Sequence, residues 1–330
     1  MRILICPDKF RGTANALVAA RALADGFAES SVELSLMPLA DGGEGTLDAL
    51  GGSNRVSQVT GPLGDPVSAK WRIAGGQAVI EMAEASGLLL AGGPDGNDPL
   101  SATTSGTGEL ISEAKAAGAK RIIIGVGGSA STDGGLGAIR AMEPLVRFAG
   151  IHLLVACDVE TRFLDAPAVF GPQKGASKLQ IELLERRLQR LSEIYVEEYG
   201  VDVTGLQRSG AAGGLAGGLA AIGAELVMGF DLVAEEVALE EAVASADIVI
   251  TGEGRLDQES FNGKVVGGVV AIAQRYQIPV VAVVGSYDLD VNVPDGMKLI
   301  SLVESFGEEP AFAETTRCLT DIGRQIAVEL

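Results

Sequence analysis

Short apolar runs alternate with longer helical patterns along this chain, and this alternation restricts the fold more than any other feature of the sequence. Residues 2–6 (RILIC) and 32–39 (VELSLMPL) have the composition of β-strands, and the Ala- and Leu-rich residues 14–30 between them have that of a helix. A strand, a helix and a second strand in this order form a βαβ unit, in which the strands are parallel.

The C-terminal part of the chain continues this pattern. Three further apolar runs occur in DIVITGEG, PVVAVVGS and LISLVES, and residues 263–277 and 311–330 have helical patterns. Together with the two N-terminal runs they make five parallel-type strands, the number in a flavodoxin-like sheet. The sequence therefore predicts an α/β fold with a flavodoxin-like five-stranded parallel sheet, provided that the residues in between form an insertion.

The middle of the chain has a different character. Residues 56–90 contain Gly-Pro, Gly-Asp-Pro and Gly-Gly pairs, which are typical of antiparallel hairpins. After them come the apolar runs RIIIGVGG and HLLVACDV, a long charged helical pattern and a stretch rich in glycine and alanine. We predict that residues 56–225 form an inserted second α/β domain, and that residues 1–55 and 226–330 form the flavodoxin-like domain.

Charge and residue usage exclude several classes of function. The formal charge of −19 over 330 residues repels nucleic acid and anionic membranes, and no apolar run approaches the length of a membrane span. The N-terminus enters a strand with no signal region, so we expect a cytoplasmic protein. Cys6, Cys157 and Cys318 lack the spacing of metal or disulfide sites, and we expect buried thiols. The single histidine, His152, opens an apolar run, which disfavours histidine-based catalysis.

A loop with glycine, an acidic residue or both follows each predicted strand. The loops read PDKFRG, ADGGEG, GGSASTDGG, CDVETR, TGEGRLD and GSYDLD. Because ligands of parallel α/β sheets bind beyond the carboxyl ends of the strands, we expect these loops to converge on one crevice.

One of these loops, PLADGGEGT, surrounds two carboxylates with three glycines. Glycines let backbone N–H groups approach an anion, while Asp41 and Glu44 could hold a cation or a hydroxyl. The structural alternative is a tight strand-to-helix turn with Asp41 as the N-cap. Because six loops of this kind are expected at the same edge, we favour the ligand-binding interpretation.

The strand-end loops also concentrate basic residues, which an acidic protein needs if it is to bind a phosphate. These residues are Lys9, Arg11, Lys174, Arg255 and Lys264. Acidic residues in the same loops could supply Mg²⁺ ligands and a base that takes a hydroxyl proton. They are Asp41, Glu44, Asp133, Asp158, Glu253 and Asp257. Positioning and charge neutralisation are most of what phosphoryl transfer requires, so the pattern indicates an enzyme that acts on a phosphorylated ligand.

Two glycine motifs leave alternatives open. There is no P-loop motif, but GVGGSA at residues 125–130 matches G-x-G-x-x-A between a predicted strand and a predicted helix, and so admits a dinucleotide-binding fold. The acidic residue that should follow about 20 positions later is absent. SGAAGGLAGGLAAIG is compatible with close helix packing or with a phosphate-facing helix N-terminus at residues 209–214.

Ten motifs carry a resemblance to a known family. They are PDKFRG, PLADGGEGT, TGPLG, EMAEASGL, TTSGTGELI, GVGGSASTDGG, VACDV, FGPQKGAS, GAAGGL and TGEGRLD followed by GKV. In their order along the chain and in their residues, these motifs resemble those of the bacterial glycerate kinase family, which has two α/β domains and no P-loop. The resemblance runs from residue 1 to about residue 286. It implies a flavodoxin-like domain with an inserted domain, the use of ATP with Mg²⁺, and phosphorylation of D-glycerate, with 2-phosphoglycerate as the favoured product.

The resemblance also implies roles for individual residues. Lys9 and Arg11 would pair with the substrate carboxylate, Lys174 or Lys264 would neutralise the transferring phosphate, and Asp158 would be the base. Further substrate-binding residues would be Asp8, Asp41, Gly42, Gly43 and Arg255. Nucleotide-binding residues would be Gly127, Gly128, Ser129, Asp133, Gly213 and Gly214. The Mg²⁺ ligands would come from Asp41, Glu44, Asp158 and Glu253.

The chain departs from the family pattern in its loops. Arg11 stands where members usually carry Lys, Ser131-Thr132 replaces Thr-Asn, Asn262 replaces His, and a glycine-rich segment of a few dozen residues before VACDV is missing. These changes suggest altered substrate preference or weakened catalysis. The alternatives are therefore a divergent paralogue for another sugar acid, or a sensor of a sugar acid or nucleotide; a nicotinamide-dependent oxidoreductase ranks last. The sequence leaves open which hydroxyl is phosphorylated and whether the chain forms a homodimer.

Overall fold

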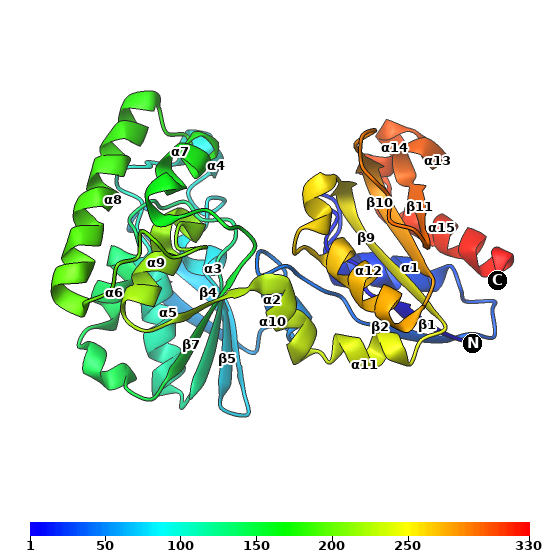
Figure 1. Ribbon diagram of the computed structural model, residues 1–330, viewed down its shortest axis with the longest axis horizontal. Helices are drawn as coiled ribbons and strands as arrows, with labels where there is room; N and C mark the ends of the chain where they lie inside the picture. Colours follow the sequence, from blue (N-terminus) through cyan, green and yellow to red (C-terminus); the bar gives the residue numbers. More distant parts are fainter. The chain divides into compact units, whose positions relative to one another are not determined.

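The computed structural model describes all 330 residues, which form two compact units (Figure 1). Unit 1 consists of Met1–Asp41, Asp48–Leu50 and Phe230–Leu330, and unit 2 consists of Gly42–Leu47 and Gly51–Gly229. The structure thus assigns residues 42–47, 51–55 and 226–229 to unit 2, although the sequence-based ranges place them in the flavodoxin-like domain.

Unit 1 contains a sheet of five parallel strands in the order β11-β10-β9-β1-β2. The strands are β1 (Arg2–Ile5), β2 (Glu33–Leu36), β9 (Ile248–Leu256), β10 (Val280–Tyr287) and β11 (Met297–Ser301). Numbered by their order within unit 1, this is the flavodoxin-like order 2-1-3-4-5. The predicted fold class is confirmed. In register, Leu4 of β1 lies between Ser35 of β2 and Val249 of β9.

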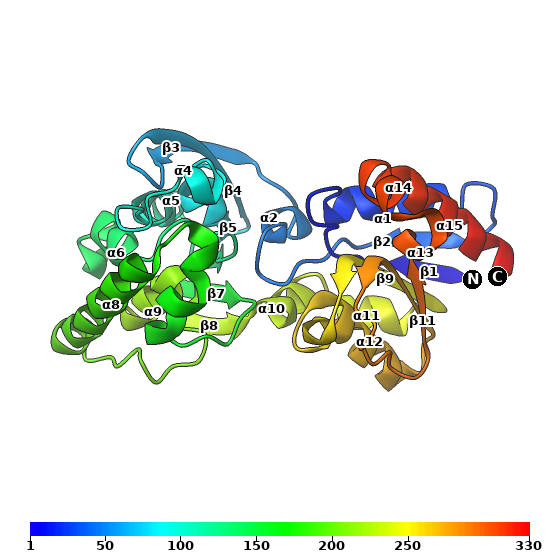
Figure 2. The same ribbon diagram turned by 90° about the horizontal axis from the view of Figure 1, so that it is seen from above.

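Helices cover both faces of this sheet (Figure 2). One face is covered by α10 (Gly229–Glu236), α11 (Leu239–Ala244) and α12 (Val265–Tyr276), and the other by α1 (Ala16–Asp25), α13 (Leu302–Phe306), α14 (Glu308–Ala313) and α15 (Thr315–Glu329). Apolar residues alternate between the faces, as a strand requires: Ile5 packs with α1 and α15, and Cys6 packs with α12. The predicted C-terminal helix is interrupted at Glu314, between α14 and α15.

Unit 2 contains a mixed sheet in the order β3-β4-β5-β6-β7-β8. The strands are β3 (Arg55–Thr60), β4 (Pro66–Ala74), β5 (Gln77–Glu81), β6 (Arg121–Gly125), β7 (His152–Cys157) and β8 (Glu225–Met228). The first three are antiparallel neighbours, which confirms the predicted hairpins, and β5 to β8 are parallel. Trp71 is buried, and its indole N–H donates a hydrogen bond of 2.9 Å to Ser57 Oγ.

Seven helices of unit 2 and five short 3₁₀ segments of the chain complete the fold. The helices are α3 (Ala83–Ser86), α4 (Gly93–Gly96), α5 (Ser105–Ala116), α6 (Leu136–Met142), α7 (Ala166–Phe170), α8 (Lys178–Tyr199) and α9 (Leu215–Ala221); α2 (Thr46–Ala49) has residues in both units. The 3₁₀ segments are η1 (Leu145–Phe148), η2 (Phe163–Asp165), η3 (Pro172–Lys174), η4 (Ala211–Gly214) and η5 (Gln258–Phe261).

The longest helix, α8, is amphipathic. It starts with a capping box between Ser177 and Gln180, and it buries Leu184, Leu188 and Tyr195. No helix of the protein combines the length and the apolar character needed to cross a membrane. All three cysteines are buried free thiols, as predicted.

Candidate active site

The chain order defines a switch point in unit 1, between neighbouring strands β1 and β9. From β1 the chain proceeds to β2 on one side, whereas β9 is followed by β10 and β11 on the other side. At such a point the loops after the two strands separate and leave room for a ligand beyond the carboxyl ends of the strands. The loops here are residues 6–13 after β1 and residues 257–264 after β9.

Asp8, Lys9 and Asp41 form a charged cluster at this switch point. The Lys9 ammonium lies 3.7 Å from Asp8 Oδ1 and 3.6 Å from Asp41 Oδ1. Both carboxyl groups are buried, with 6% of Asp8 and 7% of Asp41 exposed. The loop is held by its backbone, because Asp8 N donates to Gly252 O over 2.8 Å and Lys9 N donates to Asp8 Oδ1 over 2.7 Å. Three residues that the sequence predicted for the site are therefore in contact.

Burial raises the pKa of Asp8 to about 7, although the neighbouring Lys9 ammonium acts to lower it. Burial likewise raises the pKa of Glu253, in β9, to about 7, with a hydrogen bond from Ser260 opposing the shift. Glu253 Oε1 is buried and has no hydrogen-bond partner. A buried oxygen without a donor is costly, so Glu253 is suited to bind a proton, a metal ion or a ligand hydroxyl.

The other basic residues of unit 1 that the sequence predicted for the site follow the same strands or lie at their ends. Lys264, at the start of α12, has its ammonium 3.6 Å from Glu259 Oε2. Arg255 donates to Asp288 Oδ1 from Nε and Nη2, at 3.0 and 2.8 Å. Arg11 is exposed and lines a recess beside Gly254. All three side chains are at least partly exposed at the surface of unit 1 and can therefore contact a ligand.

The PLADGGEGT loop is explained mainly by close backbone packing in unit 2. A Cβ on Gly42, whose φ is +94°, would lie 2.8 Å from Gly229 Cα and 3.0 Å from Ala156 O, and a Cβ on Gly127 would lie 2.6 Å from Gly43 Cα. The glycines therefore let the loop pass directly over the ends of β6 and β7. Glu44, by contrast, is exposed.

The residue that caps this loop is Glu81, which the sequence did not single out. Gly45 N and Leu47 N both donate to Glu81 Oε1, at 2.9 and 2.7 Å. The alternative in which Asp41 is the N-cap is therefore wrong: a buried carboxylate at the end of β5 fills that role. The only available signal was a glutamate ending an apolar run, which is too common to identify a cap.

The four predicted metal ligands are divided between the units. Asp41 and Glu253 belong to unit 1, while Glu44 and the partly buried Asp158 belong to unit 2. Nowhere in the protein do three His, Cys, Asp or Glu side chains form a group that could hold a metal ion.

Lys174 of unit 2 is buried, with 2% exposure, and its ammonium donates to Ser131 O over 2.6 Å. Burial lowers the pKa of Lys174 to about 7, and nearby Asp133 opposes this shift. Asn97 fastens the same loops, since its Nδ2 donates to Lys174 O and Ala130 O. Asn97 Oδ1, Ser131 Oγ and Thr132 Oγ1 are buried without partners.

This environment predicts an effect of Lys174→Met on the pH dependence of stability. Between pH 7 and pH 10 the unfolded lysine stays protonated while the folded one has lost its proton, so the wild-type free energy of unfolding should rise with pH by up to about 1.4 kcal/mol per unit. The variant should lack this contribution. Urea unfolding of both proteins at pH 7 and 9.5 measures it, and parallel pH dependences would show that Lys174 titrates normally.

The predicted nucleotide-binding residues of unit 2 lie in tightly packed loops. Asp133 caps α6 by accepting from Gly135 N and Gly137 N, and it also accepts from Thr104 N and Oγ1 at 2.8 Å. Gly213 and Gly214 are buried beside Ser131 and Phe163. Gly127 and Ser129 are buried or nearly so after β6, and Gly128 is exposed.

The expectation of a helix directly after GVGGSA is wrong. Ser129 forms a bridge with Gly87, and the next helix, α6, begins only at Leu136. A dinucleotide fingerprint needs the helix N-terminus at the motif itself, where it faces the pyrophosphate. This geometry removes the support for a nicotinamide-dependent enzyme.

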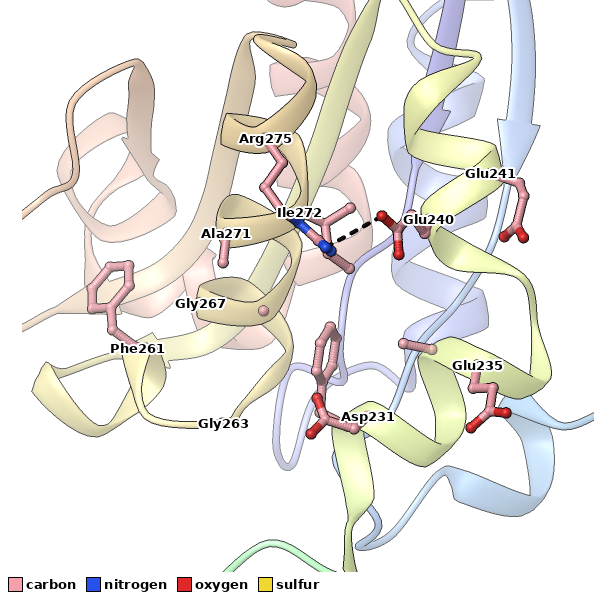
Figure 3. A pocket seen from close by; sticks show the side chains of 13 residues that line it. Asp231, Glu235, Glu240, Glu241, Phe261, Gly263, Gly267, Ala271, Ile272 and Arg275 are labelled. Carbon is pink, nitrogen blue, oxygen red and sulfur yellow. Dashed lines mark ion pairs between the residues drawn. The ribbon is translucent and has the colours of Figure 1, made fainter.

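A recess of unit 1, of about 570 Å³, lies between α10, α11 and α12 (Figure 3). Asp231, Glu235, Glu240 and Glu241 line it, against a single cation, Arg275, whose Nη1 is 3.3 Å from Glu240 Oε1. Because this excess of carboxylates repels phosphate, the recess is unsuited to phosphate chemistry.

A flavodoxin-like parallel sheet with charged groups at its switch point, together with a second α/β unit, defines a class of small-molecule-binding α/β enzymes. The glycerate kinase family model matches residues 3–146 and 142–330 of this chain. The chain belongs to the glycerate kinase family, and it is a kinase. The two matched segments meet at residues 142–146, within the stretch where the resemblance indicates a missing segment.

Individual relatives agree with this assignment. The chain is 41% identical to a glycerate kinase of Halalkalibacterium halodurans, over 86% of this chain and 85% of that protein. It is 39% identical to glycerate 2-kinase of Escherichia coli, over 89% of this chain and 87% of that protein. A crystal structure of a candidate glycerate kinase 2 from Salmonella typhimurium LT2 superimposes with a TM-score of 0.83 at 37% identity, covering 100% of this chain and 98% of that one.

Proposed function

We propose that this protein transfers the γ-phosphoryl group of ATP to a hydroxyl of D-glycerate, with Mg²⁺, and that 2-phosphoglycerate is the product. The observation that carries the proposal is the cluster of Asp8, Lys9 and Asp41 at the switch point of unit 1, beside the unpartnered Glu253 oxygen. A cation held between carboxylates offers both charge signs that an anionic hydroxy acid and a phosphate donor require.

In this proposal the side chains bind and orient the reactants. Lys9 and Arg11 pair with the glycerate carboxylate, and Asp8 and Asp41 orient its hydroxyls. Lys264 and Arg255 neutralise charge on the transferring phosphate. Asp158 takes the proton of the attacking hydroxyl as the new phosphorus–oxygen bond forms and the bond to ADP breaks. Such positioning supplies most of the catalysis in phosphoryl transfer.

The carboxylates of unit 1 fit a magnesium site of the usual kind. Mg²⁺ is generally bound by one or two carboxylates, with water and substrate phosphates completing the octahedron. Asp41 and Glu253 provide two such groups, and both lie near Asp8, because the Asp41 carboxyl acts to raise the pKa of Asp8 and Asp8 acts to raise the pKa of Glu253. When bound, Mg²⁺ would reduce the negative charge of the substrate phosphates. Glu44 and Asp158 remain proposed ligands from unit 2.

A coupled assay of ADP formation tests the function directly. Purified protein with ATP, Mg²⁺ and D-glycerate should produce ADP, EDTA should stop the reaction, and excess Mg²⁺ should restore it. Phosphorus NMR of the product should show 2-phosphoglycerate. Absence of ADP formation, together with retained binding of the acid or the nucleotide, would contradict the kinase proposal and favour a sensor.

The divergent loops justify testing a second substrate class. The family match falls into two ranges that overlap at residues 142–146, within the stretch where the resemblance implies a missing segment. The same assay with other small 2-hydroxy and sugar acids would reveal a changed preference, as a kcat/KM higher than that for D-glycerate.

A further inference from the structure

A recess of about 540 Å³ lies at the carboxyl ends of β1, β9 and β10 in unit 1, and we call it the α14 pocket. Its floor is apolar, formed by Phe10, Val303 and Ala311, which belong to the core beneath α1 and α15. Phe312 of α14 lines it with an aromatic ring that is 58% exposed. An exposed aromatic ring beside an apolar floor is typical of sites for flat ring systems.

Two glycines leave backbone exposed where β9 and β10 reach this pocket. A Cβ on Gly285 would lie 2.3 Å from Gly254 O, and a Cβ on Gly254 would lie 3.0 Å from Arg11 N. Close packing of these segments therefore requires glycine at both positions. As a consequence, peptide groups rather than side chains form this wall of the pocket.

Charged and polar groups are distributed unevenly around the α14 pocket. Arg11 and Arg255 lie at the loops that lead to the switch point, whereas Glu308 lies on α14 beside Phe312. The hydroxyl-bearing residues Thr13 and Ser286 also line the pocket. The strand ends thus contribute Arg11 and an Arg255 that is paired with Asp288, whereas α14 contributes an aromatic ring and one carboxylate.

From this arrangement, and on the basis of the proposed function, we propose that the α14 pocket binds the adenosine part of ATP. The adenine lies against Phe312, the ribose faces Thr13 and Ser286, and the phosphates extend past Arg11 toward Lys9. The volume supports a nucleoside over the three-carbon acid, because pockets for compounds of nucleoside size or larger measure about 300–1,000 Å³.

Glu308 adds a hydrogen-bond acceptor to the aromatic side of the pocket. A carboxylate only accepts hydrogen bonds, and the exocyclic amino group of adenine is a donor that it can meet.

The glycine-rich loops of unit 2, predicted from the sequence as the nucleotide site, offer less free surface. A Cβ on Gly213 would lie 2.1 Å from Ser131 O, and one on Gly214 would lie 2.8 Å from the Phe163 ring. Both glycines are buried. Packing accounts for the absence of a side chain at these two positions, as it does at Gly254 and Gly285, but the latter pair also lines the α14 pocket.

The test is calorimetric titration of ADP with Mg²⁺ into the full-length protein and the Phe312→Ala variant. Loss of one base–aromatic contact should weaken ADP binding roughly 5- to 150-fold. The matched control is Tyr276→Ala, which removes an aromatic ring that is 43% exposed and lies outside the pocket in the same unit. Its ADP affinity should be unchanged. Equal ADP affinity of Phe312→Ala and wild type would overturn the assignment.

Kinetic constants supply a second readout. Phe312→Ala and Glu308→Gln should each raise the KM for ATP while leaving the KM for D-glycerate unchanged. Both side chains are exposed, so neither change should impair folding. An unchanged KM for ATP in Glu308→Gln would show that this carboxylate does not contact the base.

The two proposals fail in different ways. A wild-type protein that binds ADP but phosphorylates no hydroxy acid disproves the kinase reaction, while the Phe312→Ala titration still decides the pocket. A wild-type protein that phosphorylates D-glycerate with ADP affinity insensitive to Phe312 keeps the function and removes adenosine from the pocket. A wild-type protein with no measurable ADP binding overturns both.

Discussion

Replacement of Lys9 by alanine is expected to lower kcat/KM for D-glycerate by about 10²- to 10³-fold, the usual cost of losing one group that stabilises transition-state charge. The Lys9 ammonium lies between Asp8 and Asp41, at 3.7 and 3.6 Å. Without it, these carboxylates and Glu253 would face an anionic acid and a phosphate with no cation between them. Steady-state kinetics in the ADP-coupled assay would measure the loss.

The fold should survive this change, because the loop is held by backbone hydrogen bonds. Asp8 N donates to Gly252 O, and Phe10 and Ala14 exchange two hydrogen bonds. Lys298→Ala is the matched control, since it removes an exposed lysine of the same unit that pairs with Glu329. That variant should retain full activity. If Lys9→Ala has wild-type kinetic constants, Lys9 has no place in the active site.

Replacement of Gly213 by alanine is expected to produce a large loss of stability. At φ +65° an added Cβ would lie 2.1 Å from Ser131 O and 2.7 Å from Thr132 Cα, both of which are backbone atoms. The left-handed conformation and the overpacking together should cost about 2–5 kcal/mol. Chemical unfolding followed by circular dichroism would measure this cost.

Gly223→Ala separates conformational strain from steric clash. Gly223 also has a positive φ, +99°, but an added Cβ would meet no atom within 4 Å. This variant should therefore show only the conformational part of the cost, roughly 1–2 kcal/mol. Ala212, next to Gly213, already occupies a left-handed conformation at φ +53°, so that conformation alone is tolerated. Equal losses in the two variants would show that packing at Gly213 is not tight.

The sheet of unit 1 was predictable because its signal is local. Apolar runs separated by helical patterns predicted the five parallel strands. Their flavodoxin-like order requires most of residues 42–229 to form a separate unit, and the structure has this division. The contact of Asp8 and Lys9 with Asp41 was also predictable, since carboxyl ends of adjacent parallel strands meet at one edge.

The errors arose where one short pattern has several structural causes. In PLADGGEGT the glycines permit backbone contact with Ala156 and Gly229, and the cap comes from Glu81. In GVGGSA the segment after the strand pairs with Gly87 and no helix follows directly. Both outcomes depend on residues distant in the sequence, which no local pattern identifies.

The fold class, the family and the charged loops follow from the sequence alone, because periodicity and motif order depend on neighbouring residues. Which of those loops can contact a ligand depends on the tertiary structure. In the sequence, both Lys9 and Lys174 lie in glycine-containing loops after predicted strands or helices. In the structure, Lys9 is partly exposed between two carboxylates, whereas Lys174 is buried and donates to Ser131 O. Segments that are far apart in the chain determine how deeply a lysine is buried and which group it pairs with. These two properties determine its pKa and whether it can bind a ligand.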